Sequence, residues 1–278
     1  MSRAPFARRE LTVTGIEDLG AYRVLRVADP PSTRVPVPAP GQFAMIAAVD
    51  RWGGGADERP YLPRAFSIAR HAAGESHFLL EDVGPGTRRL CELRPGERMW
   101  ALGPLGRGFN LEGPDLAGRR PLLLGGGVGI APHAILQDTL AARPPSAPAA
   151  VVLLGFRERR RAAGAALLKD ACIATDDGSV GHHGLVTELL AKELDRDADA
   201  VVYACGPAPM LETVRALCER HRVPGQLALE AGMACGFGAC YGCAVPRRGG
   251  GYLRVCVDGP VIDAAALERV DEHAGAPA

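Results

Sequence analysis

The first part of the chain, up to about residue 113, alternates apolar and polar positions over short runs. Glycine and proline separate five such runs, which cover residues 11–16, 22–27, 43–48, 65–69 and 77–83. Alternation with a period of two is typical of strands that bury one face, and several short strands at this spacing favour a closed sheet. We therefore predict an antiparallel β-barrel, with a loop over the glycine-rich residues 52–59.

After Gly118 the pattern changes to an apolar strand, a turn and a helix, repeated along the chain. The predicted strand and helix pairs are 121–124 with 130–142, 151–155 with 162–169, 172–174 with 185–194, and 200–204 with 210–221, before a last strand at 226–230. Strands that alternate with helices pair in parallel through right-handed crossovers. This half is predicted to be a nucleotide-binding α/β domain.

Beyond residue 230 the chain becomes rich in glycine and cysteine. A length of 278 residues accommodates two domains and a small appendage. We predict a multi-domain β plus α/β protein, with the barrel over 1–115, a parallel-sheet α/β domain over 116–224 and a small cysteine-bearing segment over 225–278.

The charge balance of the chain narrows its expected partners. The chain has 32 Lys and Arg against 32 Asp and Glu, so no net field favours nucleic acid or an anionic membrane. Residues 1–10 carry arginines without an apolar stretch behind them, and no run approaches the roughly 18 apolar residues of a membrane helix. We expect a cytoplasmic protein whose ligands are small molecules.

Four of the eight cysteines crowd near the C-terminal end of the chain. They are Cys235, Cys240, Cys243 and Cys256. Their spacing, C-x4-C-x2-C-x12-C, is the plant-type spacing for a [2Fe-2S] cluster. Thiolates around a compact anionic core require a tight loop, so Gly236, Gly238 and Gly242 are predicted to adopt positive φ and turn N–H groups toward the cluster. The fourth ligand is expected from a strand over 252–257.

Two other interpretations of these cysteines stay open. Structural zinc usually takes paired C-x2-C units, and this chain has one such unit. A disulfide pair is the other interpretation, although cysteines crowded at one end of a chain without an export signal more often serve metal or redox chemistry. Cys91, Cys172 and Cys218 lie in apolar or helical contexts, where a small buried side chain is the usual role.

Two short motifs in the barrel region predict a phosphate site. Residues 64–67 lie by the end of the third or fourth strand, and residues 84–87 open a short helix further along. Each motif alone is typical of a solvated arginine or of a capped turn. Together, Arg64 supplies fixed positive charge, while Gly86 and Thr87 present N–H groups at a helix N-terminus to a pyrophosphate. Ser67 is then placed to donate to an isoalloxazine ring.

A glycine-rich turn at 125–132 lies between a predicted strand and a helix, where the pyrophosphate of a nicotinamide cofactor would sit. Pro132 stands where the last glycine of G-x-G-x-x-G would be, so a tight turn without a ligand is the alternative. Arg157 and the arginines at 159–161 follow the next strand, where an arginine can favour the 2′-phosphate of NADP. A solvated helix start is the alternative for this charged run.

The order of these motifs resembles the ferredoxin-reductase-type flavoproteins, and more narrowly the electron-transfer subunits of class 1B dihydroorotate dehydrogenases. The motifs are RAFSI, LEDVGPGT, LGPLGRGF, GGGVGIAP, ATDDGS, ACGPAPM and LEAGMACGFGACYGC. The resemblance spans nearly the whole chain, and the ordered combination makes it specific. It implies an FAD-binding barrel, an NAD-binding α/β domain and a C-terminal [2Fe-2S] segment.

The resemblance also implies individual site residues. Those implied for FAD are Arg64, Ala65, Phe66, Ser67, Leu79, Leu80, Glu81, Gly86 and Thr87. Those implied for NAD are Gly126, Gly127, Gly129, Gly206 and Pro207, with Cys205 facing the nicotinamide as the catalytic residue. A thiol simply buried at a strand end is the alternative for Cys205. Two departures put local contacts in question: Ala65 replaces an expected proline, and Ala231-Gly232 replaces an expected Glu-Arg pair.

A nicotinamide moves two electrons as hydride, whereas a [2Fe-2S] cluster takes one at a time, and FAD can exchange either number. The resemblance therefore implies a subunit that passes electrons from an FMN-containing dihydroorotate dehydrogenase catalytic subunit to NAD⁺, within a heterotetramer of pyrimidine biosynthesis. The chain is too short to contain that partner as well, since a TIM barrel alone takes about 250 residues. The alternatives are the reductase subunit of a ferredoxin-linked NAD(P) transhydrogenase or hydrogenase, and a non-catalytic zinc adaptor.

Overall fold

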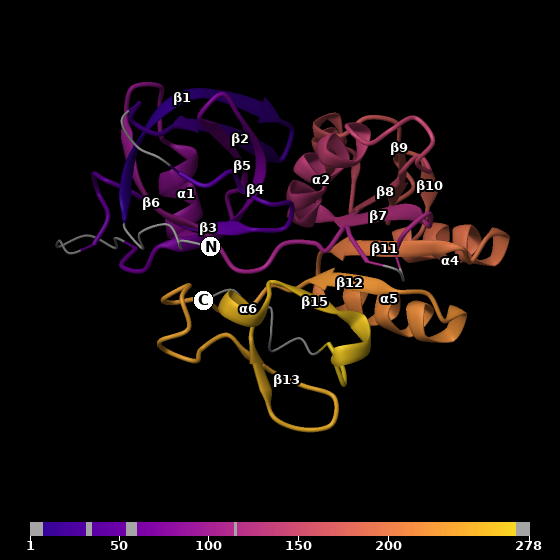
Figure 1. The fold of residues 1–278 in the computed structure, drawn as a ribbon. Coiled ribbons are helices and arrows are strands. Elements are labelled where there is room, and N and C mark those ends of the chain that lie inside the picture. Colours follow the sequence, from indigo (N-terminus) through magenta and orange to yellow (C-terminus); the bar gives the residue numbers. More distant parts are fainter. Residues whose placement is uncertain (1–7, 32–34, 54–59, 114–115, 271–278) are drawn as a thin grey trace.

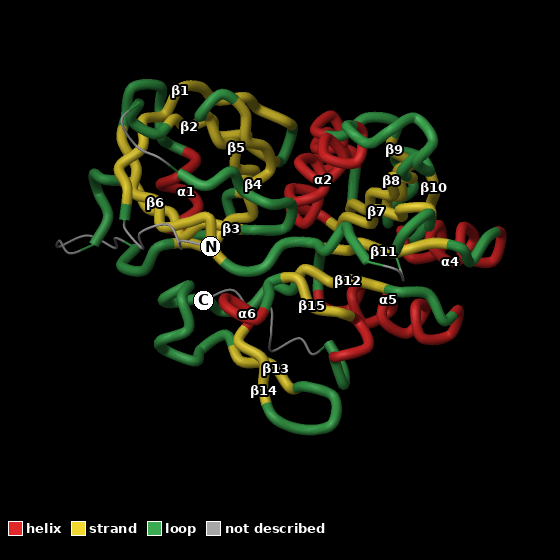
Figure 2. The backbone as a smooth tube through the Cα atoms, in the orientation of Figure 1, coloured by secondary structure: helices red, strands yellow, loops and turns green. Residues whose placement is uncertain are grey.

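The computed structural model describes residues 8–31, 35–53, 60–113 and 116–270. Residues 1–7, considered above for a secretory signal, and most of the predicted loop over 52–59 lie outside the described residues. Figures 1 and 2 show a barrel beside an α/β domain, with the C-terminal segment lying along both.

Six antiparallel strands form a closed barrel in the order β1-β2-β5-β4-β3-β6, which confirms the predicted barrel. They are β1 (Arg9–Leu19), β2 (Tyr22–Ala28), β3 (Phe43–Ala48), β4 (Arg64–Ala72), β5 (Glu75–Glu81) and β6 (Arg98–Leu105), and helix α1 (Pro85–Cys91) follows β5. Along β1, Leu11 and Val13 are buried, whereas Thr12 between them is exposed. The side chains thus alternate between the barrel interior and solvent.

Strand β6 is the barrel strand that the alternation pattern does not predict. It contains Gly103 and Pro104, residue types that are depleted inside strands. It nevertheless pairs with β1 on one side and with β3 on the other, and so closes the barrel. Pairing with two neighbours outweighs the weak local signal.

A seven-stranded sheet forms the second domain, in the order β10-β9-β8-β7-β11-β12-β15. The strands are β7 (Arg120–Gly126), β8 (Val151–Phe156), β9 (Ala171–Thr175), β10 (His182–His183), β11 (Ala200–Cys205), β12 (Gly225–Ala228) and β15 (Val261–Asp263). All neighbours pair in parallel except β12 with β15. The chain builds β8 to β10 on one side of β7 and then crosses to β11, so the topological switch point lies between β7 and β11.

Helices α2 (Ala131–Ala141), α4 (Val186–Arg196) and α5 (Ala208–His221) occur where helices were predicted. The helix predicted over 162–169 is wrong, because a single turn α3 (Arg159–Ala162) gives way to the 3-10 turn η2 (Ala163–Leu167). Gly164 weakens the local helix tendency by about 1 kcal/mol. It also packs against the barrel, where a Cβ on Gly164 would lie 2.7 Å from Tyr22 Cδ2. No described helix has both the length and the apolar character needed to cross a bilayer.

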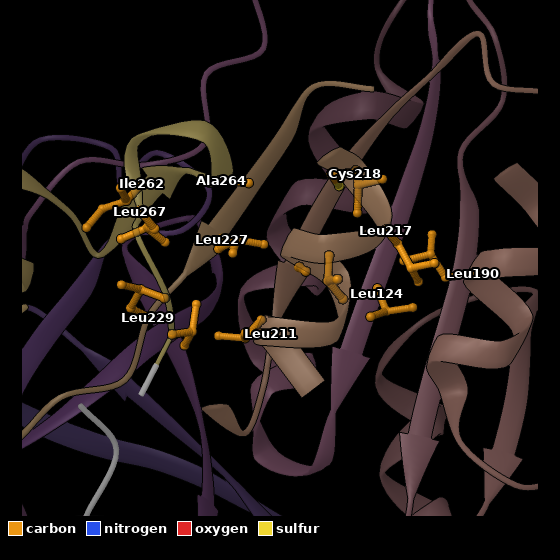
Figure 3. Close-up of a cluster of buried hydrophobic side chains, with 14 of the residues drawn as sticks. Leu124, Leu190, Leu211, Leu217, Cys218, Leu227, Leu229, Ile262, Ala264 and Leu267 are labelled. Atoms are coloured by element: carbon orange, nitrogen blue, oxygen red, sulfur yellow. The ribbon is translucent and has the colours of Figure 1, made fainter. Parts of the chain in front are cut away.

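The C-terminal segment is a small unit fastened to the sheet. It contains β13 (Ala244–Pro246), β14 (Tyr252–Arg254), the helical turn α6 (Val255–Asp258), strand β15 and the 3-10 turn η3 (Ala264–Ala266). The strand predicted over 252–257 ends at Arg254, so Cys256 lies on α6 instead. A hydrophobic core shown in Figure 3 joins this unit to α5 and the sheet, and includes Leu211, Leu217, Leu227, Leu229, Ile262 and Leu267.

Candidate functional site

The sequence analysis placed the predicted flavin motif at the end of a strand. The structure places it at the start of strand β4. Strand β4 pairs with β3 so that Ser67 lies opposite Phe43. The Arg64 side chain reaches the start of α1, where a Cβ on Gly86 would lie 2.7 Å from Arg64 Nε. Arg64 Nη1 also donates to the Leu62 carbonyl at 2.8 Å. The structure thus brings together the arginine and the glycine that were predicted to share a phosphate site.

Thr87 shapes the backbone at the start of α1. Its hydroxyl accepts N–H bonds from Val83 at 2.9 Å and from Gly84 at 3.0 Å. The hydroxyl is therefore committed to the turn. Thr87 thereby fixes the backbone that carries Gly86 next to Arg64.

Strand β5 contributes two buried side chains and one carboxylate. Leu79 and Leu80 are buried in the hydrophobic cores on the two sides of the strand. Glu81 ends the strand and forms an ion pair with Arg161 of the α/β domain. Arg159 donates to the Ser179 carbonyl at 2.5 Å. Two of the arginines that were predicted near a ribose 2′ group are therefore held by the protein itself.

The predicted nicotinamide residues meet at the switch point between β7 and β11. The 3-10 turn η1 (Gly127–Ile130) leaves β7, and a Cβ on Gly129 would lie 2.5 Å from the Cys205 carbonyl oxygen. A Cβ on Gly206 would lie 2.5 Å from Met210 Cε and 3.1 Å from Gly126 Cα. The two loops thus approach each other at the carboxyl edge of the sheet, where dinucleotides bind in sheets of this kind.

Cys205 and Glu230 lie within electrostatic range of each other at this edge. Burial raises the pKa of the Cys205 thiol well above its usual value, and the Glu230 carboxylate raises it further. Glu230 is partly exposed to solvent. Nearby protein atoms still desolvate its carboxylate and raise its pKa. The sequence analysis did not identify Glu230. The available signal was an acidic residue at the end of the last predicted strand, 226–230, at the same sheet edge as Cys205.

The four predicted cluster ligands lie in one compact region as two pairs. Cys243 Sγ and Cys256 Sγ are 3.2 Å apart and buried, while Cys235 is hydrogen-bonded to the exposed Cys240. Among the described residues, no three Cys, His, Asp or Glu side chains converge as a site for a single metal ion. Two thiol pairs suit a two-iron cluster with two cysteines on each iron better than they suit one zinc ion.

Backbone amides surround the Cys235 sulfur. Burial raises the pKa of this thiol, but hydrogen bonds from Phe237, Cys240 and Ala239 outweigh burial and lower the pKa to about 6. Burial and the neighbouring Cys243 raise the pKa of Cys256 to about 12. The loop therefore favours an anionic sulfur at its first cysteine.

Residues 235–243 form a loop with three of the four cysteines, the cysteine loop. Two of the three glycines predicted to have positive φ in this loop do so. Gly236 has φ 79° and Gly238 has φ 86°, values that glycine adopts without strain. The prediction for Gly242 is wrong, because the positive φ falls on its neighbour Tyr241, at 58°. Tyr241 is thus the third residue of the loop with a left-handed backbone conformation.

The cysteine loop rests on the barrel next to the flavin motif. A Cβ on Gly236 would overlap the Met45 side chain and would lie 3.3 Å from Leu105 Cδ1. Met45 pairs across the sheet with Ala65, the second residue of the flavin motif. The loop therefore contacts the strand that neighbours the motif.

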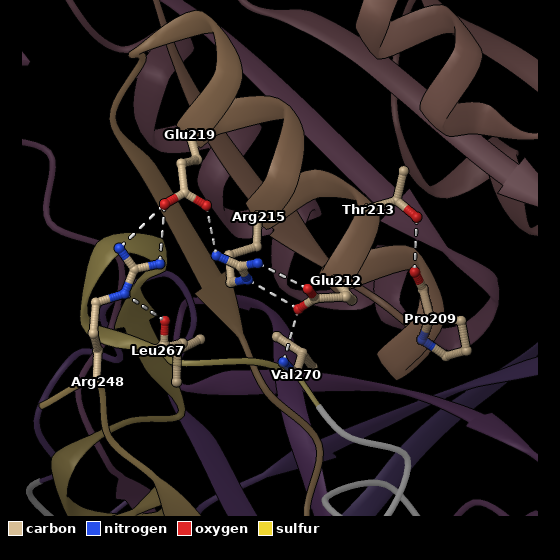
Figure 4. A network of polar contacts seen from close by, with 8 residues as sticks. All are labelled: Pro209, Glu212, Thr213, Arg215, Glu219, Arg248, Leu267 and Val270. Atoms are coloured by element: carbon tan, nitrogen blue, oxygen red, sulfur yellow. Dashed lines mark hydrogen bonds and ion pairs between the residues drawn. The ribbon is translucent and has the colours of Figure 1, made fainter. Parts of the chain in front are cut away.

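Ion pairs fasten the C-terminal unit to α5, as Figure 4 shows. Arg248, in the turn between β13 and β14, pairs with Glu219 at 3.2 Å, and Glu219 pairs with Arg215 at 3.0 Å. Arg215 also pairs with Glu212 at 2.9 Å, and Glu212 accepts the Val270 N–H at 2.8 Å. Part of this network lines a cavity of about 520 Å³, to which none of the predicted site residues belongs.

The structure accommodates both departures from the expected motifs. Ala65 is exposed on β4. Apart from its chain neighbours, no atom of the described residues lies within 4 Å of a Cβ placed on Gly232, so a larger residue would also fit there. Ala231 packs against the core that contains Cys243 and Cys256. Neither departure disturbs a cysteine of the loop.

A six-stranded barrel, a dinucleotide-type sheet and a four-cysteine loop define an oxidoreductase subunit with the ferredoxin-reductase fold. The NADH-dependent reduced ferredoxin-NADP oxidoreductase has this fold, with a TM-score of 0.74 and 22% identity over 93% of this chain and 90% of that one. The ferredoxin reductase of carbazole 1,9a-dioxygenase gives a TM-score of 0.62 and 22% identity over 80% of this chain and 67% of that one.

Residues 230–268 match the model of the iron-sulfur cluster binding domain of dihydroorotate dehydrogenase B. The dihydroorotate dehydrogenase B (NAD(+)) electron transfer subunit of Geobacillus thermodenitrificans is 41% identical over 237 residues, which are 82% of this chain and 86% of the relative. That of Caldanaerobacter subterraneus is 38% identical over 228 residues, 81% of this chain and 85% of the relative. The chain belongs to the family of dihydroorotate dehydrogenase B electron transfer subunits.

Proposed function

We propose that this chain carries electrons between NAD(H) and a partner subunit that oxidises dihydroorotate on FMN, with FAD and a [2Fe-2S] cluster as its own redox groups. The observation that carries the proposal is the contact between the cysteine loop and Met45, one strand away from the flavin motif. Electron transfer requires closely spaced redox groups, and this contact supports such spacing. The names of the curated relatives support the choice of substrate and of NAD.

The barrel residues support FAD as the flavin. When bound, FAD supplies the exchange of electrons singly or in pairs. Arg64 offers positive charge to its pyrophosphate, and the backbone at Gly86, held in shape by Thr87, lies against the same guanidinium. Ser67, on the same strand as Arg64, is proposed to donate to the flavin ring.

Cys235, Cys240 and Cys243 of the loop and Cys256 of α6 would hold the cluster, which supplies one-electron chemistry. All four must be thiolates in that state, so metal binding releases protons. Cys235 is already inclined to ionise, since three backbone N–H groups point at its sulfur. Cys256 needs the metal to ionise it, because burial and the neighbouring Cys243 raise its pKa.

The turn at 126–129 and the loop at 205–207 would hold the nicotinamide cofactor. Gly129 and Gly206 leave no room for side chains between the two loops, so the backbone itself can approach the cofactor. Cys205 remains a neutral thiol beside the site. NAD is favoured over NADP because Arg161 is engaged by Glu81 and Arg159 by a backbone carbonyl.

The partner is proposed to dock on the face of the cysteine loop, in a heterotetramer. Cys240 is exposed there, and Tyr241 and Tyr252 of the same unit are 63% and 74% exposed. Exposed aromatic residues are common anchors of protein interfaces. A ferredoxin-linked transhydrogenase or hydrogenase would use the same groups with another partner. The 41% identity to dihydroorotate dehydrogenase B subunits favours the dihydroorotate partner.

The test is the visible spectrum of the anaerobically purified chain before and after addition of NADH, with iron and acid-labile sulfide assayed on the same sample. We expect flavin peaks with a broad iron-sulfur shoulder, both of which bleach with NADH. A colourless protein that contains zinc in place of iron would contradict the cofactor assignments and favour the adaptor. A coloured protein that NADH does not bleach would contradict the nicotinamide site alone.

A further inference from the structure

Arg254 lies where β14 meets the helical turn that carries Cys256, and its side chain reaches into the cysteine loop. Arg254 Nη1 lies 3.4 Å from the Gly238 carbonyl oxygen, and the guanidinium carbon lies 5.2 Å from the centre of the Tyr241 ring. The Arg254 backbone N–H donates to Asp258 Oδ2 at 2.8 Å, and Nε lies 3.7 Å from the same oxygen. The guanidinium is therefore held by a carbonyl, an aromatic ring and a carboxylate.

The contact with the Gly238 carbonyl matters because of peptide geometry. This carbonyl belongs to the same planar unit as the Ala239 N–H, and in a trans peptide the two groups point in opposite directions. The Ala239 N–H donates to the Cys235 sulfur. The guanidinium thus holds one side of a peptide whose other side faces a predicted cluster ligand.

The packing around Gly238 leaves this peptide little freedom. Gly238 has φ 86°, and a Cβ there would lie 2.7 Å from Val257 Cγ2 and 3.2 Å from Arg254 Nη1. The arginine therefore fits closely against the loop and does not extend into solvent. Its side chain is 32% exposed.

We propose that Arg254 is a positioning residue that raises the reduction potential of the [2Fe-2S] cluster. The inference rests on the proposed function, since it concerns the cluster that the four cysteines would hold. Arg254 acts in two ways: it orients an amide that donates to the Cys235 sulfur, and it places a positive charge against the loop. A cluster becomes more negative on reduction, so hydrogen bonds to sulfur and nearby positive charge both favour the reduced form. Asp258 offsets part of this charge.

The experiment is a redox titration of the purified full-length chain, followed by the EPR signal of the reduced cluster. Arg254→Gln removes the positive charge and the planar guanidinium group with its paired N–H donors. We expect its ratio of reduced to oxidised cluster at a fixed potential to fall about tenfold, a shift of about 59 mV to lower potential for a one-electron couple. Arg254→Lys keeps the positive charge but lacks the planar guanidinium group, so a smaller shift of the potential in the same direction is expected.

Two further variants sharpen the test. Asp258→Asn keeps an oxygen that can accept the Arg254 N–H but removes the negative charge, so the potential is expected to rise. Arg247→Gln is the matched control, because it removes an exposed arginine from the turn between β13 and β14, and the potential should not change.

The outcomes separate this inference from the proposed function. A fully loaded Arg254→Gln or Asp258→Asn protein that titrates at the wild-type potential would overturn the inference. So would a shift of the same size in Arg247→Gln, because it would show a general charge effect. If Arg254→Gln takes up no cluster, Asp258→Asn and Arg254→Lys decide, since both retain the cation. A wild-type chain without iron and sulfide would overturn the proposed function as well.

Discussion

At the scale of single residues, the same side chain is given opposite properties by its surroundings. Cys205 is buried, and its pKa lies well above the usual value. Burial also acts on Cys235, but three backbone N–H groups outweigh it and lower the pKa to about 6. The proposed function requires these two states, because it places Cys205 beside a nicotinamide ring and Cys235 on a metal. The arrangement of amides and apolar atoms, more than residue type, separates the two roles.

His133 of α2 is buried beside the glycine-rich turn at the end of β7, where a Cβ on Gly125 would lie 3.1 Å from His133 Cδ2. Its Nε2 donates to the Leu124 carbonyl at 2.9 Å, its Nδ1 has no partner within the described part of the chain, and its ring stacks on Phe109. Burial lowers the pKa of this ring to about 4. The folded protein therefore holds His133 neutral at pH values where the unfolded chain would protonate it.

We predict that His133 makes the free energy of unfolding depend on pH. The stability that accompanies the neutral ring is fully present above the unfolded pKa of about 6.5 and is lost as the pH falls through the folded value of about 4. A shift of this size corresponds to about 3 kcal/mol. Urea unfolding of the wild type between pH 7 and pH 4 should show this loss, and His133→Gln, which keeps an N–H donor, should show much less. Equal losses in the two proteins would contradict the prediction.

Residues whose role depends on local spacing could be predicted from the sequence, and residues whose role depends on distant partners could not. The cysteine motif and the glycine turn are each defined within a few positions. Glu230, by contrast, is distinguished by its electrostatic effect on Cys205, and the proposed role of Arg254 depends on its contact with the Gly238 carbonyl. Arg161 was one of the arginines considered as able to favour a 2′-phosphate, but it pairs with Glu81, 80 positions away.

At the scale of elements, the predictions succeed where burial on one face imposes a period on the sequence. Strands β1 and β2 and helices α4 and α5 follow that rule. Strand β6 and the turn η2 do not, because each takes its conformation from neighbours in the fold: β6 from pairing with β1 and β3, and η2 from close packing on β2.

The turn η1 provides a prediction at this scale. A Cβ on Gly129 would lie 2.5 Å from the Cys205 carbonyl oxygen, so Gly129→Ala must push η1 away from the end of β11. Overpacking of this kind costs about 1–3 kcal/mol of stability. We expect Gly129→Ala to lower the melting temperature and to slow flavin reduction by NADH at least about tenfold, since about 1.4 kcal/mol of lost transition-state binding has that effect. The FAD content should not change.

The matched control for this variant is Gly232→Ala, because the Cβ that it adds has, within the described part of the chain, only its chain neighbours within 4 Å. Its melting temperature and its rate of flavin reduction should equal those of the wild type. Both quantities can be measured by thermal unfolding and by anaerobic stopped-flow spectroscopy. A Gly129→Ala protein that NADH reduces at the wild-type rate would show that the nicotinamide binds elsewhere.

At the scale of the whole molecule, the order of the three units could be predicted from the sequence, but their packing could not. The rhythm of the sequence changes at each unit, so the units separate by inspection. Their mutual placement depends on single contacts, such as Gly236 on Met45 and Glu81 with Arg161, that leave no periodic signal. The proposed path for electrons is a property of that placement.

The proposed function assigns dihydroorotate oxidation to the partner subunit and electron transfer to this chain. This division of labour gives a prediction for the assembled protein. The purified chain alone should not convert dihydroorotate to orotate, and adding the FMN subunit should couple that reaction to NAD⁺ reduction. Tyr252→Glu should weaken assembly about tenfold or more, because it charges a 74% exposed aromatic residue on β14, the strand that leads to Cys256. Leu185→Glu, at a 57% exposed position at the start of α4, is the control and should assemble normally.

Calorimetric titration of one subunit with the other measures this assembly, and flavin absorbance reports whether FAD is retained. Normal assembly of the Tyr252→Glu variant would exclude this face as the docking surface. Conversion of dihydroorotate by the isolated chain would contradict the division of labour itself.

The pairing of β12 with β15 has a consequence for how such proteins can be built. Ala228 pairs with Val261, so the segment with all four predicted cluster ligands leaves the sheet and returns to it at adjacent points. That segment is an insertion between two adjacent strands, and it leaves the parallel strands of the sheet uninterrupted. A short hairpin turn in its place would close the same two strands. The proposed function makes this insertion the exit for electrons, so replacing it with a hairpin turn should leave the scaffold intact and remove that exit.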